Sequence, residues 1–291
     1  MLPIFVLIKI FTYLPKQDCL KLRVLNKRIA AVFRPKKIFL NEESAHLDIK
    51  HVKKVICHKL FKFLPILENN PQITKLITNH NIKKRTNVKL LNYLKNLTYL
   101  EYRKKSLADI SIFENLVFYK GPHNHYANKL VNLKSIYLTE TATEMHYFIP
   151  GLKKFVICSS SNHAINILDL RCSYDLKHFV LKINVFFTEF YLPYNVKTLK
   201  APYFDLFYIV KPNILYHLEK LYAKIPLFEA PKLKKLKTQD ITTFKLYKIS
   251  LECLHYYGNE ILDLSGMPFL RKVKTDSNII NLPETAVLKR F

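Results

Sequence analysis

The chain has 291 residues, 49% of them apolar, and a formal net charge of +25 from 47 basic and 22 acidic residues. This apolar content suffices for a sizeable core and argues against a disordered chain. With only 4 glycines and neither glycine-rich loop that holds nucleotide phosphates, the sequence weighs against a nucleotide-binding enzyme. The basic excess predicts an anionic partner, either an acidic protein surface or a polyanion.

The cysteines and the N-terminal sequence bear on the compartment. The five cysteines are odd in number and lack paired CxxC spacing, which favours a reduced intracellular setting over a disulfide framework. The apolar run 2–14 has Lys9 in its middle and no basic residue before it, unlike a signal peptide. It is also shorter than the about 20 apolar residues that cross a bilayer. We expect an intracellular protein, cytoplasmic or nuclear or both, that does not engage a membrane.

Two short amphipathic helices are predicted in the first forty residues. The first begins at Leu2, tolerates Pro3 in its first turn because that N–H needs no helical partner, and ends at Pro15. Asp18 can cap the second helix, whose apolar residues over 19–29 return at helical spacing. The two helices must share a small core.

Several residues in these two helices follow the order and spacing of a known helical module. They are Leu2-Pro3, Ile10-Phe11, Leu14-Pro15, Asp18 with Leu20 and Leu22, and Leu25 with Lys27-Arg28. In this order and spacing they resemble the F-box, the module that attaches receptor subunits to the SCF-type ubiquitin ligase through a Skp-type adaptor. Phe5 stands where the family usually has Glu, and Ile29 where it usually has Trp. The resemblance implies an adaptor-facing surface made of Leu2, Pro3, Ile4, Ile8, Phe11, Leu14 and Pro15. The alternative is an ordinary helical cap for a repeat array.

Residues 41–72 are expected to form a helical linker. Apolar residues from Val52 to Leu64 recur at helical spacing, which predicts a helix that ends before Pro65. His51, Cys57 and His58 are interpreted as packing and surface residues, because no second Cys/His pair accompanies them as a zinc site requires. We therefore expect no metal in this linker.

From residue 73 onward one spacing recurs, with apolar residues at relative positions 1, 4 and 6. It is clearest at Leu251, Leu254 and Tyr256. On a strand, positions 4 and 6 point inward, whereas positions 3 and 5 point to the opposite, solvated face. The first residues of the eleven predicted repeats are Ile73, Leu97, Phe113, Leu133, Leu152, Leu176, Val196, Leu218, Leu233, Leu251 and Leu270. Their mean spacing of about 20 residues lies at the short edge of the leucine-rich-repeat period.

This period indicates an α/β leucine-rich-repeat solenoid, with parallel strands along the concave face of a horseshoe and one continuous core. The expected parts are an F-box-like helical domain over 1–40, a helical linker over 41–72 and the solenoid over 73–291. An asparagine at position 9 is expected to bond backbone groups in the turn after the strand. It occurs as Asn81, Asn184, Asn259 and Asn278.

Two segments interrupt the regular frame. The long step from Leu152 to Leu176 contains Ile165, Leu168 and Leu170, which repeat the apolar spacing and form either a strand on the back face or an extra loop. The segment 121–125 (Gly-Pro-His-Asn-His) is read as a turn. Its two histidines are interpreted as part of a solvated loop rather than as metal ligands.

The outward positions 3 and 5 of the last five repeats carry six lysines and no acidic residue. The predicted target-binding residues are Lys200, Lys220, Tyr222, Lys235, Lys237, His255, Lys272 and Lys274. Such a strip suits an acidic or phosphorylated protein, because ammonium groups pair with carboxylate and phosphate oxygens. A nucleic-acid backbone with bases stacked on Tyr137 and Tyr222 is the second interpretation. A solvated face without a special ligand is the third.

The sequence predicts a non-catalytic protein without a cofactor or metal. No HExxH, GxSxG or phosphate-loop motif occurs. With the F-box resemblance, we expect a substrate-recognition subunit of an SCF-type E3 ubiquitin ligase, bound to a Skp-type adaptor and the cullin core through its N-terminal helices and to a target through its repeats. The alternative is a leucine-rich-repeat interaction scaffold, or a nucleic-acid-binding protein, without ligase attachment.

Overall fold

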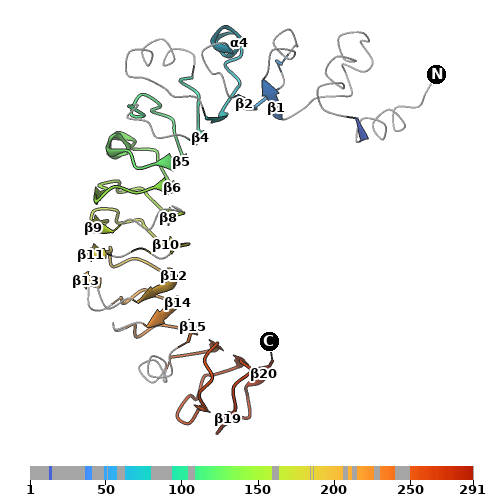
Figure 1. The fold of residues 1–291 in the computed structure, drawn as a ribbon, viewed down its shortest axis with the longest axis vertical. Coiled ribbons are helices and arrows are strands. Elements are labelled where there is room, and N and C mark those ends of the chain that lie inside the picture. The colour runs from blue at the N-terminus through green and yellow to red at the C-terminus, as the bar shows by residue number, and fades with distance from the viewer. Residues whose placement is uncertain are drawn as a thin grey trace, which may run out of the picture. The chain divides into compact units, whose positions relative to one another are not determined.

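The computed structural model describes residues 13–14, 37–40, 49–50, 52–57, 63–79, 94–103, 109–158, 164–183, 185, 187–205, 209–211, 215–225, 230–239 and 250–290. The chain divides into two compact units, Met1–Tyr126 and Ala127–Phe291. We call them the N-terminal and the C-terminal unit. Parallel strands stacked in chain order dominate each of them (Figure 1).

The described part of the N-terminal unit contains short parallel strands in chain order. They are β1 (Lys37–Leu40), β2 (Lys54–Cys57), β3 (Lys75–Thr78), β4 (Tyr99–Tyr102) and β5 (Phe118–Pro122). From β1 to β5, each strand pairs with the next in continuous register. The α-helix α4 (Leu64–Glu68) lies in the connection between β2 and β3, and its proline stands in the first turn, where a missing N–H is tolerated.

The helix expected from Val52 to Leu64 is wrong, because Lys54–Cys57 form the strand β2. Val55 and Cys57 are fully buried, and the residues between and before them are less so, which is the two-residue period of a strand. Val55 aligns with Leu76 of the next repeat, so the 1-4-6 frame already applies here. Over so few residues the apolar spacing fits both periods, and pairing with the neighbouring strand decides the outcome.

The 1-4-6 frame is confirmed in ten of the eleven predicted repeats. In these ten, the side chains at positions 1 and 4 are no more than 2% exposed. Position 6 is buried as well, even where it holds a threonine, as Thr78, Thr238 and Thr275 show. The inward side chains of successive strands therefore form a continuous column in each unit, as expected of stacked repeats.

The remaining repeat, the third along the chain, was predicted to begin at Phe113, which is three residues too early. Strand register aligns Phe118 with Tyr99 and Tyr119 with Leu100, so Tyr119 occupies position 4. Tyr119 is 1% exposed, and its hydroxyl donates to the Pro122 carbonyl at 2.8 Å. A tyrosine at position 4 conceals the frame from a search for aliphatic residues. Gly121 makes room for this ring, because a Cβ there would lie 2.6 Å from the tyrosine oxygen.

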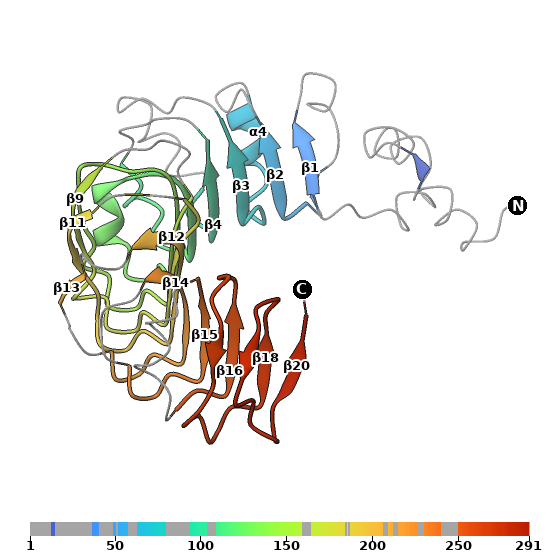
Figure 2. The ribbon, with the colours of Figure 1, turned by 60° about the horizontal axis from the view of Figure 1, so that its bottom comes forward.

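The C-terminal unit has a long parallel front sheet. Its strands are β6 (Ser135–Glu140), β8 (Lys154–Ile157), β10 (His178–Leu181), β12 (Thr198–Asp205), β14 (Lys220–Ile225), β15 (Lys235–Thr238), β16 (Cys253–Tyr256), β18 (Lys272–Lys274) and β20 (Val287–Lys289). Each strand pairs with the next strand of this series. Figure 2 shows the last of them, β15 to β20, side by side.

A second parallel sheet covers the back of this unit. It contains β7 (Glu144–His146), β9 (Ile165–Asp169), β11 (Phe187–Tyr191) and β13 (Ile209–Lys211). A further pair joins β17 (Leu262–Asp263) to β19 (Ile279–Ile280). The segment that contains Ile165 was predicted to form either a strand on the back face or an extra loop, and the strand is confirmed. Aromatic rings fill the space between the sheets, with Phe179 of β10 at 4.9 Å from Phe190 of β11, centroid to centroid.

Most of the described connections between repeats are short turns. The N–H of the position 1 residue bonds to the carbonyl three residues earlier, as for Leu152 on Ile149 and Leu218 on Leu215, both at 3.0 Å. Within the described repeats, helix is confined to α4 and the 3-10 helix η3 (His125–Lys129). The described repeats are therefore β-rich rather than α/β. A repeat of about 20 residues that contains two strands leaves no room for a helix of several turns.

Asparagines bond neighbouring repeats, but they do so from a different position of the repeat than the predicted position 9. Of the position 9 asparagines, Asn259 and Asn278 are exposed, and Asn81 and Asn184 lie outside the described residues. The bonding asparagines stand directly before position 1. Their side-chain amides donate to a carbonyl of the preceding repeat, Asn96 to Pro71 at 3.2 Å, Asn115 to Lys95 at 2.8 Å and Asn195 to Tyr174 at 3.0 Å.

Candidate functional site

The predicted target-binding residues lie together on neighbouring strands of the C-terminal unit. We call them the lysine face, which consists of Lys200, Lys220, Tyr222, Lys235, Lys237, His255, Lys272 and Lys274. The register forms one row from Lys200, Tyr222, Lys237, His255 and Lys274, and a second from Lys220, Lys235, Cys253 and Lys272. Neighbours in a row stand about 4.8 Å apart, the spacing of paired strands. The lysine face is therefore a regular array.

Strand alternation explains why these lysines gather on one surface. Leu221, Leu236 and Leu254 lie between the two rows and are fully buried on the opposite side of the sheet. The lysines on either side of them are exposed or half-buried. A lysine stem can cover the sheet while its ammonium group reaches water, so these positions accept lysine without burying a charge.

Tyr222 lies in the middle of the lysine face and contacts two of its lysines. The ammonium nitrogens of Lys200 and Lys237, its neighbours in the row, lie 4.9 and 5.4 Å from its ring centroid. Lys237 also lies 5.4 Å from the ring of Tyr257. A cation over an aromatic face is stabilised by about 0.5–1 kcal/mol at an exposed site. These contacts hold the ammonium groups near the sheet.

Acidic residues are absent from positions 3 and 5 of the described front strands from β10 to β20. Directly before β14 and β16, Glu219 and Glu252 stand at position 2. There they pair with Lys197 at 2.9 Å and Lys234 at 3.1 Å. The hydrogen bond from Lys197 is the main reason that the pKa of Glu219 lies below its ordinary value. Because these acids already pair with position 2 lysines, the lysine face keeps an excess of positive charge.

The pKa of His255 is sensitive to these positive charges. Burial of the ring and, after it, repulsion from Lys235, Lys237, Lys272 and Lys274 lower its pKa from 6.5 to about 4. His178 of β10 shows the same effect in the same direction, first from burial and then from nearby lysines. Both imidazoles are therefore neutral at pH 7 despite being close to several cations.

The outward surface of the N-terminal unit differs. Tyr99 and Phe118 stack with ring centroids 4.3 Å apart, and Lys54 lies 5.6 Å from the Tyr99 ring. Glu101 is 6% exposed and binds Arg103 at 3.0 Å and Lys120 at 3.2 Å. Burial alone would raise the pKa of Glu101, but the hydrogen bonds from both cations bring it below its ordinary value. Position 3 holds a shorter lysine row on β1, β2 and β3, where Lys37, Lys54 and Lys75 align in register. On β4 and β5 an aromatic pair takes this position, beside a neutralised acid.

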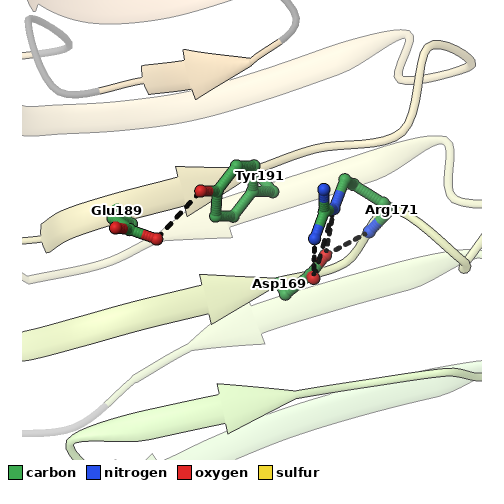
Figure 3. Close-up of polar contacts among 4 residues, drawn as sticks. All are labelled: Asp169, Arg171, Glu189 and Tyr191. Carbon is green, nitrogen blue, oxygen red and sulfur yellow. Dashed lines mark hydrogen bonds and ion pairs between the residues drawn. The ribbon is translucent and has the colours of Figure 1, made fainter.

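A polar cluster on the back sheet was not foreseen from the sequence (Figure 3). Asp169 is 4% exposed and accepts bonds from Arg171, including Nη2 at 2.7 Å and the backbone N–H at 3.0 Å. The guanidinium lies 4.3 Å from the Tyr191 ring centroid, and the Tyr191 hydroxyl donates to Glu189 at 2.8 Å. Burial would raise the pKa of Asp169, but the bonds from Arg171 lower it. Each charged group has a partner, so we assign the cluster a structural role.

A short sequence signal marks this turn. Asp109, Asp169 and Asp263 each stand seven residues before position 1 of a repeat and are followed by an aliphatic residue and then Ser or Arg. In all three, the carboxylate accepts the backbone N–H two residues later, at 2.9, 3.0 and 2.9 Å. At Asp169 and Asp263 this Asx turn ends the back strands β9 and β17 and starts the turn that leads to the next front strand.

The candidate metal ligands do not converge within the described residues. No group of three His, Cys, Asp or Glu side chains there is arranged to hold a metal. Burial raises the pKa of Cys57 to about 12, which keeps its thiol protonated, and His51 and His58 lie outside the described residues. The segment read as a turn at Gly121 instead begins with the last two residues of β5, and the 3-10 helix η3 starts at His125.

The predicted adaptor-facing residues lie almost entirely outside the described part of the chain. Leu14 alone among them is described, and it is half-buried. Leu2, Pro3, Ile4, Ile8, Phe11 and Pro15 are not placed. Among the described elements, no helix combines the length and the apolar character needed to span a membrane.

No protein-family model and no curated protein sequence matches the chain. A structure of the Toll–Spatzle complex, a molecular hub in Drosophila development and innate immunity, matches 88% of this chain at 14% identity with a TM-score of 0.52. The chain spans 44% of that Toll-complex chain. A leucine-rich-repeat protein of Leptospira interrogans matches 84% of this chain and 76% of its own at 17% identity, with a TM-score of 0.45. The parallel register, the buried 1-4-6 frame and the first match together show that the fold is a leucine-rich-repeat solenoid.

Proposed function

We propose that this chain is a non-catalytic interaction protein that binds an acidic or phosphorylated protein on its lysine face. The observation that carries the proposal is the pair of lysine rows in strand register, without an acid at positions 3 and 5. Ammonium groups at strand spacing pair with carboxylate or phosphate oxygens. Their summed field also concentrates anionic partners at the surface and speeds their association.

The lysine contacts of Tyr222 and Tyr137 favour an acidic protein over nucleic acid as the partner. Single-stranded nucleic acid binds without sequence preference by stacking bases on open aromatic rings. Tyr222 lies under the ammonium groups of Lys200 and Lys237, and Tyr137 lies 5.2 Å from that of Lys154. A base could stack on these faces only after displacing a favourable cation. Carboxylates and phosphates, in contrast, can bind the ammonium groups where they are.

We extend the proposal to a ubiquitin-ligase receptor on the basis of the first forty residues. Their resemblance to the F-box supports attachment to a Skp-type adaptor and a cullin core. Nine basic residues stand there against the single acid Asp18, which favours encounter with an acidic adaptor. The chain would then act by proximity, because a target held on the repeats exposes its lysines to the ubiquitin-carrying enzyme at high effective concentration.

A charge-matched pair of variants tests the lysine face. One variant replaces Lys200, Lys220, Lys235, Lys237 and Lys272 by Gln, and its control replaces Lys134, Lys153, Lys177, Lys182 and Lys232 by Gln. Both lose the same charge from the C-terminal unit. We expect the first to bind a glutamate-rich peptide containing phosphoserine about 50-fold more weakly, since exposed ion pairs contribute roughly 0.5 kcal/mol each. The control should stay within about threefold, because its lysines lie outside the face.

Fluorescence anisotropy with labelled peptide measures both affinities. Equal losses in the two variants would mean that net charge, rather than the lysine face, attracts the peptide. A single-stranded oligonucleotide that binds the parent chain more tightly than the peptide, and loses affinity in the first variant, would favour the nucleic-acid reading instead.

Adaptor binding tests the ligase attachment separately. The full chain should retain a purified Skp-type adaptor in a pull-down, and replacing Leu2 and Pro3 by Ala should abolish retention while peptide binding at the lysine face stays unchanged. Failure of the parent chain to retain any adaptor would remove the ligase part of the proposal and leave an interaction scaffold.

A further inference from the structure

One histidine stands at the centre of the densest part of the lysine face. Strand β16 presents Cys253 and His255 outward, and it lies between β15 and β18. Register places Lys235 and Lys272 on either side of Cys253, and Lys237 and Lys274 on either side of His255. With paired strands about 4.8 Å apart, all four ammonium groups can reach one point above β16.

The His255 ring has no hydrogen-bond partner in the protein. Neither Nδ1 nor Nε2 is accessible to solvent, and neither finds a donor or acceptor. Native structures seldom keep a buried polar group without a partner, because such a group has lost its hydrogen bonds to water and gained none in return. Among the described residues, the long side chains that flank the ring in register are the lysines of β15 and β18.

The charges around the ring oppose its protonation. On the two strands packed against β16, the groups that face His255 are Lys235 and Lys237 of β15 and Lys272 and Lys274 of β18. Together with burial they hold the pKa of His255 at about 4. A dianion placed among these cations would reverse the field at the ring, so the imidazole would gain a proton and donate from both nitrogens.

The number of donors distinguishes a phosphomonoester from a carboxylate. A phosphorylated side chain carries about −1.5 to −2 charges and three acceptor oxygens, whereas a carboxylate carries one charge and two oxygens. Four ammonium groups and an imidazolium exceed what one carboxylate can accept. They match a tetrahedral dianion, whose oxygens each accept more than one charge-assisted hydrogen bond.

We propose that Lys235, Lys237, Lys272 and Lys274, arranged around Cys253 and His255, form a binding seat for a single phosphomonoester group of the partner protein. We call these six residues the phosphate seat. The proposal rests on the anion-binding function proposed for the lysine face and assigns its phosphate specificity to this one point.

Three versions of one glutamate-rich peptide test the seat on the full chain, with serine, glutamate or phosphoserine at a central position. We expect the phosphoserine peptide to bind about tenfold more tightly than the glutamate peptide, the change expected from one or two added charge-assisted hydrogen bonds. NMR titration of the imidazole should show the pKa of His255 rising by at least about one unit with the phosphoserine peptide and much less with the glutamate peptide.

A histidine variant and a matched control locate the effect. His255→Asn should reduce the preference for phosphoserine over glutamate from about tenfold to about twofold. His178→Asn removes a second lysine-surrounded histidine, four strands away in the same sheet, and should leave the preference intact. The NMR readout uses the parent chain and does not depend on the folding of either variant.

The outcomes separate the seat from the wider proposal. Equal affinity for the phosphoserine and glutamate peptides, with an unchanged pKa of His255, would overturn the seat and leave the lysine face as a general acidic-peptide site. Loss of preference in His178→Asn but not in His255→Asn would also overturn it. If neither anionic peptide bound, the proposed function of the lysine face would fail together with the seat.

Discussion

The ionisation of His255 couples to folding. Its pKa is about 4 in the folded chain against an ordinary 6.5, so between these values the unfolded chain binds more protons. The free energy of unfolding therefore falls as the pH drops from about 6.5 to about 4, and recovers as the pH rises. At pH 7 the ring is neutral in both states and contributes no pH dependence.

Urea unfolding of the parent chain and of His255→Asn checks this sign. We expect the parent to lose more stability than the variant between pH 7 and pH 5, because only the parent must keep this imidazole unprotonated while folded. His217→Asn serves as the control for loss of a histidine as such, because His217 is exposed. Parallel pH profiles for the parent and His255→Asn would show that the ring titrates normally in the folded state.

At the scale of single residues, the outward lysines were predictable and several other roles were not. Lys235 and Lys237 follow from alternation around a buried leucine, which the sequence displays directly. Tyr119 was missed because a tyrosine is an unusual occupant of an aliphatic position and needs Gly121 to accommodate its ring. Asp169 was missed because its partner Arg171 became relevant only once the back strand was known to end there.

At the scale of elements, one buried leucine per strand links neighbouring repeats. Leu221 of β14 aligns with Leu199 of β12 and Leu236 of β15, and all three are fully buried. Replacing Leu221 by Ala removes packing from three repeats at once. We expect a loss of about 2–5 kcal/mol in the free energy of unfolding, as for other buried leucines.

Hydrogen exchange shows whether this effect spreads along the sheet. In Leu221→Ala, backbone amides of β12 and β15 should exchange faster than in the parent, since each repeat depends on its neighbours. Val131→Ala is the control, because Val131 is 77% exposed and should change stability by less than about 0.5 kcal/mol. A loss confined to β14, or a similar loss in the control, would contradict a shared core.

The elements most easily predicted were those with repeated apolar spacing. The front strands carry this signal many times, so single ambiguities average out. Strand β2 carries it once, over residues that also fit a helix, and was assigned wrongly. The back strands vary in length and position between repeats, so only β9 was singled out, although Phe187, Phe190 and Leu192 repeat the apolar spacing at β11. The pairing of β9 with β7 and β11 then places it on the back face.

At the scale of the whole molecule, the N-terminal unit has the larger basic excess, but in the C-terminal unit the strands order basic side chains on one surface. Much of the net charge of +25 is spread over the sequence, but acids at position 2 and lysines at positions 3 and 5 make the strand surface strongly basic. The solenoid itself follows from the repeat period. The F-box interpretation depends on the spacing of about thirty residues, nearly all outside the described part of the chain, and remains a prediction from sequence.

Lysine footprinting tests most directly whether the lysine face is the binding surface. The full chain is acetylated briefly with and without a saturating amount of the phosphoserine peptide, and the modification of each lysine is measured by mass spectrometry. We predict that Lys200, Lys220, Lys235, Lys237 and Lys272 react several-fold more slowly when the peptide is bound, whereas Lys153, Lys177 and Lys232 react as before. Uniform slowing of all lysines, or protection confined to Lys54 and Lys75 of the N-terminal unit, would contradict the assignment.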